Sequence, residues 1–157
     1  MIQIRAMQTE DCTEVANIDR ACFFNAWSLS MFEELFRFPA NHYYVAVDSL
    51  NAEENQIIGF AGILVSVDTA DIMNIGVLPT YRSQGIGSLL IQKLEEDAEI
   101  SKCEQMMLEV RESNAAAIEL YRKHGFEQIS VRKNYYSNPT EHGLIMQKPI
   151  ISTMRRQ

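Results

Sequence analysis

The stretch DIMNIGVLPTYRSQGIGSLLIQKL, residues 71–94, predicts a strand, a turn and a helix in succession. The apolar run at 72–77 is typical of a buried strand. Pro79 ends this strand, because proline donates no backbone hydrogen bond and restricts the residue before it. A helix with one apolar face then begins at the glycine pair Gly85 and Gly87. The residues expected on that face are Ile86, Leu89, Leu90, Leu94 and Ala98.

The glycine-containing turn has two interpretations. The free N–H groups and the dipole at a helix N-terminus favour an anion such as phosphate, and Arg82 would add a charge-assisted bond. The turn is not a P-loop, because no Gly-Lys-Ser/Thr closes it, and it lacks the third glycine of a dinucleotide fingerprint. A plain tight turn that caps the helix explains this segment equally well.

Length and composition favour one globular domain over residues 1–150, with residues 151–157 as a frayed basic tail. The chain has 157 residues, of which 46% are hydrophobic. Its apolar runs are too short to span a bilayer, and its first residues do not resemble a secretory signal. We therefore expect neither membrane insertion nor export.

The cysteine pattern and the net charge further restrict the expected cellular environment and the expected partners. Cys12, Cys22 and Cys103 are isolated and have no metal-like spacing, which favours a reducing cytoplasm and no metal site. The formal net charge of −7 argues against general nucleic-acid binding and favours a basic partner.

The chain before the central stretch predicts a strand at 2–5, two helices and two further strands. The first helix starts at 9–11, and Ser28 is expected to cap the second. The strands fall at 43–48 and 57–67, joined by a polar loop at 49–56. Between the helices lies an aromatic loop, in which core packing is the favoured role for Phe23. Phe24 and Trp27 fit a core role and a substrate-facing role equally well.

Glu109 lies in an apolar strand at 106–110, which follows a strand and a helix and should therefore run parallel to the 72–77 strand. A carboxylate there is costly unless it is paired or functional. One interpretation is an ion pair with Arg111, two residues on. The other is a base at a cleft, and local sequence does not separate them.

Ser113 and Asn114 are expected to cap a helix that carries Tyr121 and ends at Gly125. Tyr121 fits a core position with its hydroxyl at the edge, and His124 fits a histidine at the helix C-terminus. Two strands follow near 126–135 and 144–148, joined by a polar, aromatic turn.

Together these motifs resemble the GNAT superfamily of N-acetyltransferases. Residues 77–87 resemble its motif A, and residues 108–126 resemble its motif B in the version found in the RimI group. Residues 132–136, Arg-Lys-Asn-Tyr-Tyr, and the loop before Trp27 also resemble that group, although Asn25-Ala26 stands where Phe-Pro is frequent. The resemblance extends over residues 2–149.

The resemblance implies an α/β fold with helices on both faces of a mixed, mostly antiparallel sheet of about seven strands. The strands at 71–77 and 106–110 would be parallel and splay apart, so that donor and acceptor meet there. The donor would be acetyl-coenzyme A, with no metal. The implied donor-binding residues are Ile75, Gly76, Val77, Arg82, Ser83, Gln84, Gly85, Ile86, Gly87, Ser88, Asn114 and Tyr121.

The RimI group acetylates the N-terminal alanine of a small-subunit ribosomal protein. The resemblance implies direct transfer, with Glu109 as general base and Tyr121 as general acid. The implied acceptor-binding residues are Phe24, Trp27, Asn74, Glu109, Tyr135 and Tyr136. The partner would be the N-terminus of a basic ribosomal protein, met in the cytoplasm by a monomer or weak dimer, with no nucleic acid and no membrane involved.

Three alternatives remain. The same fold could acetylate another protein N-terminus, a lysine or a small amine, although Tyr135-Tyr136 resembles the peptide-gripping loop of N-terminal acetyltransferases. A non-catalytic coenzyme A-binding module would not need both Glu109 and Tyr121. A cysteine nucleophile lacks a Cys-His signature.

Overall fold

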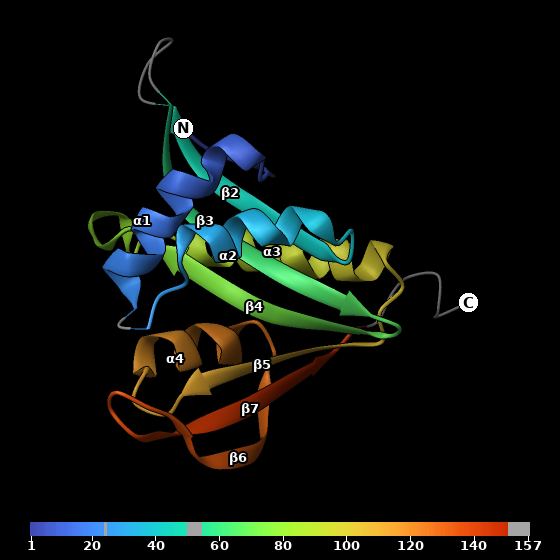
Figure 1. The fold of residues 1–157 in the computed structure, drawn as a ribbon. Helices are drawn as coiled ribbons and strands as arrows, with labels where there is room; N and C mark the ends of the chain where they lie inside the picture. Colours follow the sequence, from blue (N-terminus) through green and yellow to red (C-terminus); the bar gives the residue numbers. More distant parts are fainter. Residues whose placement is uncertain (24, 50–54, 151–157) are drawn as a thin grey trace. The chain divides into compact units, whose positions relative to one another are not determined.

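The computed structural model describes residues 1–23, 25–49 and 55–150. Within them, the strands form one seven-stranded sheet in the order β1-β2-β3-β4-β5-β7-β6 (Figure 1). β4 pairs in parallel with β5, whereas β1 with β2, β2 with β3, β5 with β7 and β6 with β7 are antiparallel. This mixed sheet confirms the predicted fold class.

The bounds are β1 Ile2–Ala6, α1 Cys12–Cys22, α2 Leu29–Glu34, β2 Asn41–Ser49, β3 Asn55–Ser66, β4 Thr69–Val77, α3 Ile86–Ile100, β5 Gln105–Arg111, α4 Ala115–Lys123, β6 Glu127–Tyr136 and β7 Glu141–Pro149. Short 3-10 helices are η1 Thr9–Asp11, η2 Leu35–Arg37 and η3 Pro79–Tyr81. Phe24, part of the predicted 49–56 loop and the predicted tail at 151–157 lie outside the described residues. In the part of the chain that is described, no helix is long and apolar enough to cross a membrane.

The chain divides into two compact units. The first contains the described residues up to Leu64 together with Met73–Leu94, and the second contains Val65–Ile72 and the described residues from Glu95 onward. Hence β3, β4 and α3 each contribute to both units. The predicted site residues also fall into two groups, one in each unit.

In the first unit, helices cover both faces of the sheet, as Phe60 and Gly59 of β3 show. The Phe60 ring meets Phe32 of α2 edge to face at 5.6 Å between centroids. A Cβ at Gly59 would lie 3.3 Å from Leu90 of α3. Because consecutive strand residues face opposite sides, α2 and α3 lie on opposite faces (Figure 1). The main core cluster joins α1 and α2 to β2 and β3.

Two predictions about apolar residues were wrong. Phe23, expected in the core, is 38% exposed, because α1 ends at Cys22 and its C-cap residue turns outward in extended conformation. Leu89 is 40% exposed, whereas Ile86, Leu90, Leu94 and Ala98 are buried. The buried residues are spaced four apart, and each four-residue step advances about 40° around the helix. The row of buried side chains therefore turns away from the side on which Leu89 lies.

In the second unit, successive side chains of β5 alternate between a buried face and a more open face. Met106, Leu108 and Val110 are buried, while Glu109 and Arg111 on the other face are half-buried. The side chain of Asn114 caps α4 by accepting a bond from the N–H of Ala117, and the helix ends before Gly125 at a φ of +91°. Both helix boundaries confirm the sequence prediction.

Candidate active site

In the first unit, the turn between β4 and α3 has the backbone of an anion cradle. Ser83 and Gly85 adopt left-handed φ values of +64° and +81°. A Cβ at Gly85 would meet no atom within 4 Å, so the space above this residue is open. The Arg82 Nε donates to the carbonyl of Val77 at 3.3 Å and its side chain is exposed. The turn therefore fits a phosphate group at the start of a 15-residue helix.

The end of β4 is held closely by its neighbours in the first unit. A Cβ at Gly76 would lie 2.9 Å from the Phe60 ring, so the strand passes where no larger residue fits. The thiol of Cys22 donates to the carbonyl of Val77 at 3.3 Å. The predicted donor-binding residues Ile75–Val77 therefore lie on a strand end whose position is fixed by packing.

Asn74, a predicted acceptor-binding residue, accepts a hydrogen bond from the hydroxyl of Tyr43 through its Oδ1. Burial, and then the negative charge of Asp19, raise the pKa of Tyr43 above its ordinary value. Tyr43 is therefore protonated at neutral pH and remains the donor. The amide nitrogen of Asn74 is not used in this bond.

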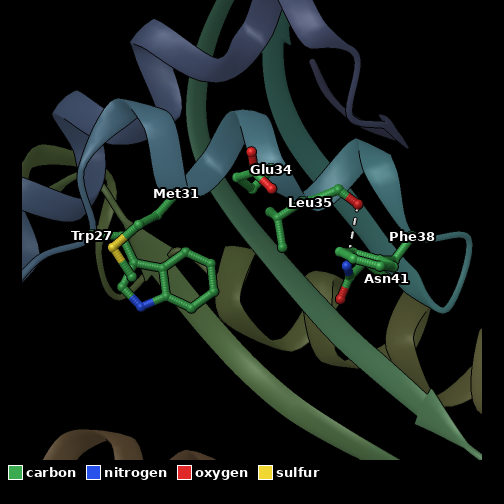
Figure 2. Close-up of a pocket in the computed structure, with 6 residues that line it drawn as sticks. All are labelled: Trp27, Met31, Glu34, Leu35, Phe38 and Asn41. Carbon is green, nitrogen blue, oxygen red and sulfur yellow. Dashed lines mark hydrogen bonds between the residues drawn. The ribbon is translucent and has the colours of Figure 1, made fainter.

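Trp27 lines an open apolar pocket of about 280 Å³ on α2 and the segment after it (Figure 2). The other lining residues are Met31, Glu34, Leu35, Phe38 and Asn41. The indole lies 5.2 Å from the Phe32 ring, and the backbone N–H of Trp27 donates to Asp19 at 2.8 Å. Trp27 thus packs on the core and also lines a pocket. Its substrate-facing role stays a prediction. Phe24 lies outside the described residues.

Glu109 is the centre of the predicted residues in the second unit. Its Oε1 lies 3.3 Å from the Nε of Arg132 on β6. Its Oε2 is buried and has no hydrogen-bond partner among the described residues. The alternative of an ion pair with Arg111 was wrong, because Arg111 binds Glu141 at 3.2 Å instead. A buried carboxylate oxygen without a partner is uncommon in folded proteins, and a catalytic role is one explanation for it.

Tyr121, Tyr135 and Tyr136 gather near Glu109. Burial and the neighbouring Tyr136 raise the pKa of Tyr121 well above its ordinary value of 10. Burial, Glu109 and Tyr135 raise the pKa of Tyr136 to about 12. The rings of Tyr135 and Tyr136 meet edge to face at 5.0 Å. The structure therefore brings Glu109 together with the three predicted tyrosines, and the raised pKa values keep Tyr121 and Tyr136 protonated at neutral pH.

Arg111 holds the turn after Tyr136. It donates to the carbonyls of Ser137 at 3.0 Å and Pro139 at 3.1 Å, and its guanidinium lies 4.5 Å from the centre of the Tyr136 ring. Glu141, its ionic partner, also accepts from the N–H of Ser113 at 2.7 Å. Asn114, a predicted donor-binding residue, caps α4 next to this network. The turn that follows the tyrosines is thus bound to Arg111 of β5, and Glu141 after it is bound to Ser113 before α4.

Sequence reasoning missed several residues around Glu109. Asp71 lies opposite Met107 in the parallel β4–β5 pair, and burial together with the charge of Glu109 raises its pKa. The predicted parallel pairing, once a register was chosen, could have placed Asp71 near Glu109. Arg132 and Glu141 reach this region through the order of the last three strands, for which the local sequence holds no signal.

Comparisons with protein families and solved structures identify proteins that are similar to this chain in sequence and in fold. The acetyltransferase (GNAT) family matches residues 12–126. The [ribosomal protein bS18]-alanine N-acetyltransferase of Escherichia coli K12 is 32% identical over 152 residues, which are 96% of this chain and 99% of that protein. The Haemophilus influenzae protein of the same name is 44% identical over 97 residues, 60% of this chain and 66% of that protein. The crystal structure of the ribosomal-protein-S18-alanine N-acetyltransferase from E. coli has a TM-score of 0.85 at 31% identity, covering 96% of this chain and 94% of that chain. The chain belongs to the acetyltransferase (GNAT) family.

Proposed function

We propose that this protein transfers an acetyl group from acetyl-coenzyme A to the N-terminal alanine of a ribosomal protein of the bS18 type. The observation that carries the proposal is the likeness, over 96% of the chain, to the E. coli enzyme with that named activity. The motif B segment at 108–126 and the Tyr135-Tyr136 pair also support it.

The proposed donor site is the turn after β4 and the strand end before it. Acetyl-coenzyme A supplies an acetyl group already activated as a thioester. The backbone N–H groups of residues 82–88 and the Arg82 guanidinium would hold its pyrophosphate, and residues 75–77 would bind the pantetheine arm. Asn114 would bind the pantetheine or the phosphate region. The open space above Gly85 supports this assignment, because a phosphate needs close access to the backbone there.

The proposed chemistry needs one base and one acid from the chain. A peptide α-amine has a pKa of about 7.7–8.0, so a carboxylate is sufficient to remove its proton. Glu109 would take one ammonium proton through a water, and the freed electron pair on nitrogen would form the carbon–nitrogen bond as the carbon–sulfur bond breaks. The nitrogen loses a second proton as the amide forms, and this proton balances the one that the leaving sulfur gains. Tyr121, whose raised pKa keeps it protonated, would return a proton to the leaving sulfur.

The proposed acceptor is a basic protein N-terminus. Phe24, Trp27, Asn74, Tyr135 and Tyr136 would contact its first residues, and the net charge of −7 suits a basic chain. The enzyme would act in the cytoplasm as a monomer or weak dimer, without contacting nucleic acid.

The test is acetyl transfer to short peptides. We expect fast turnover on a bS18-type peptide with a free N-terminal alanine, and a loss of about 10²–10⁴-fold in kcat for Glu109→Gln and for Tyr121→Phe. Glu99→Gln and Tyr44→Phe are matched controls that should keep wild-type rates. Turnover confined to N-terminally blocked lysine peptides or spermidine would overturn the proposed acceptor. Coenzyme A binding with no turnover on any amine would indicate a binding module instead.

A further inference from the structure

The two oxygens of the Glu109 carboxylate have different surroundings, and this difference assigns a role to a neighbouring residue. The inference rests on the proposed function, in which Glu109 is the general base. Oε1 lies 3.3 Å from the Nε of Arg132, while Oε2 is buried with no partner among the described residues. A carboxylate can rotate about its last bond and exchange its two oxygens. An arginine on one oxygen removes that freedom and presents the other oxygen in one direction.

The strand register explains how Arg132 reaches Glu109. Across β5, β7 and β6, Arg111, Gly143 and Arg132 lie opposite one another in one row. Glu109 lies in the next row, opposite Ile145 of β7. Arg132 is therefore a diagonal neighbour of Glu109 with β7 between them, and a long side chain is needed to cover the distance.

The middle of this row has room because position 143 is glycine. A Cβ there would lie 3.2 Å from the Tyr136 ring and 3.4 Å from the Tyr135 ring, so these rings occupy the space of the missing side chain. The Arg132 guanidinium lies 5.2 Å from the centre of the Tyr135 ring. Arg132 is thus held between an aromatic ring and the carboxylate, which limits the positions it can adopt.

We propose that Arg132 is a positioning residue for the general base: it holds Oε1 of Glu109 so that Oε2 takes the proton from the acceptor amine. One N–H bond of the ammonium breaks, an O–H bond forms at Oε2, directly or through one water, and the electron pair stays on the nitrogen. Arg132 exchanges no proton in this step and only orients the carboxylate that does.

The solvent exposure of the two side chains distinguishes a positioning role for Arg132 from a role in stabilising the fold. The Arg132 side chain is 54% exposed and that of Glu109 26% exposed, so their ion pair is open to solvent and contributes little to folding. We therefore expect Arg132→Gln to fold with an unchanged melting temperature. Its effect should fall on turnover, with a kcat about 10- to 100-fold below wild type. The KM for acetyl-coenzyme A should not change.

The experiment measures kcat and both KM values on the free-alanine peptide for Arg132→Gln, Arg132→Lys and the neighbouring control Lys133→Gln. Lysine should restore part of the lost rate, because it keeps a cation near Oε1, and the Lys133 variant should match wild type. The deciding variant combines Arg132→Gln with Glu109→Gln. If Arg132 acts through Glu109, the combined variant is no slower than Glu109→Gln alone.

Other outcomes overturn the inference in distinguishable ways. If the two losses multiply, or if Arg132→Gln raises only the KM of the peptide, Arg132 binds the acceptor and does not position the base. If Arg132→Gln is as fast as wild type, it has no role in turnover, although the proposed function stands. If the wild-type protein acetylates no amine, the proposed function fails and this inference fails with it.

Discussion

Gly85 adopts a φ of +81°, a region in which residues with a Cβ are strained, yet a Cβ there would contact nothing within 4 Å. Replacement by alanine would thus cost backbone strain without any clash. We predict that Gly85→Ala lowers the free energy of unfolding by about 1–2 kcal/mol. It should also weaken coenzyme A binding, because the relaxed turn would move its N–H groups.

Denaturant unfolding and calorimetric titration with coenzyme A measure the two effects. Gly85→Asn is the matched control, since asparagine tolerates left-handed backbone better than alanine. It should lose less in both measurements. Equal losses for the two variants would mean that side-chain bulk, and not the backbone conformation, determines the effect.

At the level of elements, the turn between β6 and β7 depends on the ionised form of Glu141. Bonds from the side chain and backbone of Ser113, together with the Arg111 guanidinium, lower the pKa of Glu141 below its ordinary value of 4.5. A lowered folded-state pKa gives stability that is present above the unfolded pKa and is lost as pH falls through the folded one. We therefore predict that Glu141→Gln lowers the melting temperature at neutral pH and that this difference shrinks below a pH of about 4.5.

Thermal melts of both proteins over that pH range test the prediction. Glu127→Gln, at the exposed start of β6, serves as the control and should show no such pH-dependent difference. A melting-temperature difference for Glu141→Gln that stays constant down to acid pH would show that its charge does not hold the turn.

The elements themselves could be predicted from the sequence, because each follows from a local pattern. Alternation places Met106, Leu108 and Val110 on one face of β5, and Gly125 marks the end of α4 through its conformation. The partners of Glu109 could not be predicted in this way. Residues two apart on a strand are about 6–7 Å apart along the chain direction. Arg111 therefore finds a nearer carboxylate in Glu141.

The order of the strands in the sheet explains why the contact between Arg132 and Glu109 could not be predicted. β7 is the last strand in the chain but lies between β5 and β6 in the sheet. Arg132 on β6 therefore reaches Glu109 on β5 across a strand that follows both residues in the sequence. Tyr135 and Tyr136 were found from a recognisable motif. Arg132 belongs to the same motif, but the motif does not show that it lies beside Glu109, because that contact depends on a register that only the folded sheet defines.

At the scale of the whole molecule, charge should govern the encounter with the acceptor. The chain has 21 acidic and 14 basic residues, a formal net charge of −7. A basic peptide is therefore attracted before any specific contact forms, and this attraction acts over about 10 Å at 0.1 M salt but only about 3 Å at 1 M. Acetyl-coenzyme A is an anion and would be repelled by the same net field, so its binding would depend on the proposed donor site at residues 82–88.

We predict that kcat/KM for a basic free-alanine peptide falls as salt is raised from about 0.05 to about 0.5 M, because screening removes long-range attraction. A peptide with the same first residues but uncharged downstream positions should show little change. Acetyl-coenzyme A is kept saturating, so that its own salt dependence does not enter, and kcat should be nearly constant for both peptides. Parallel decreases for the two peptides would show that salt acts on the enzyme and not on the encounter. The acidic surface would then have no part in selecting a basic acceptor, and selection would depend on the tyrosine pair and the Trp27 pocket alone.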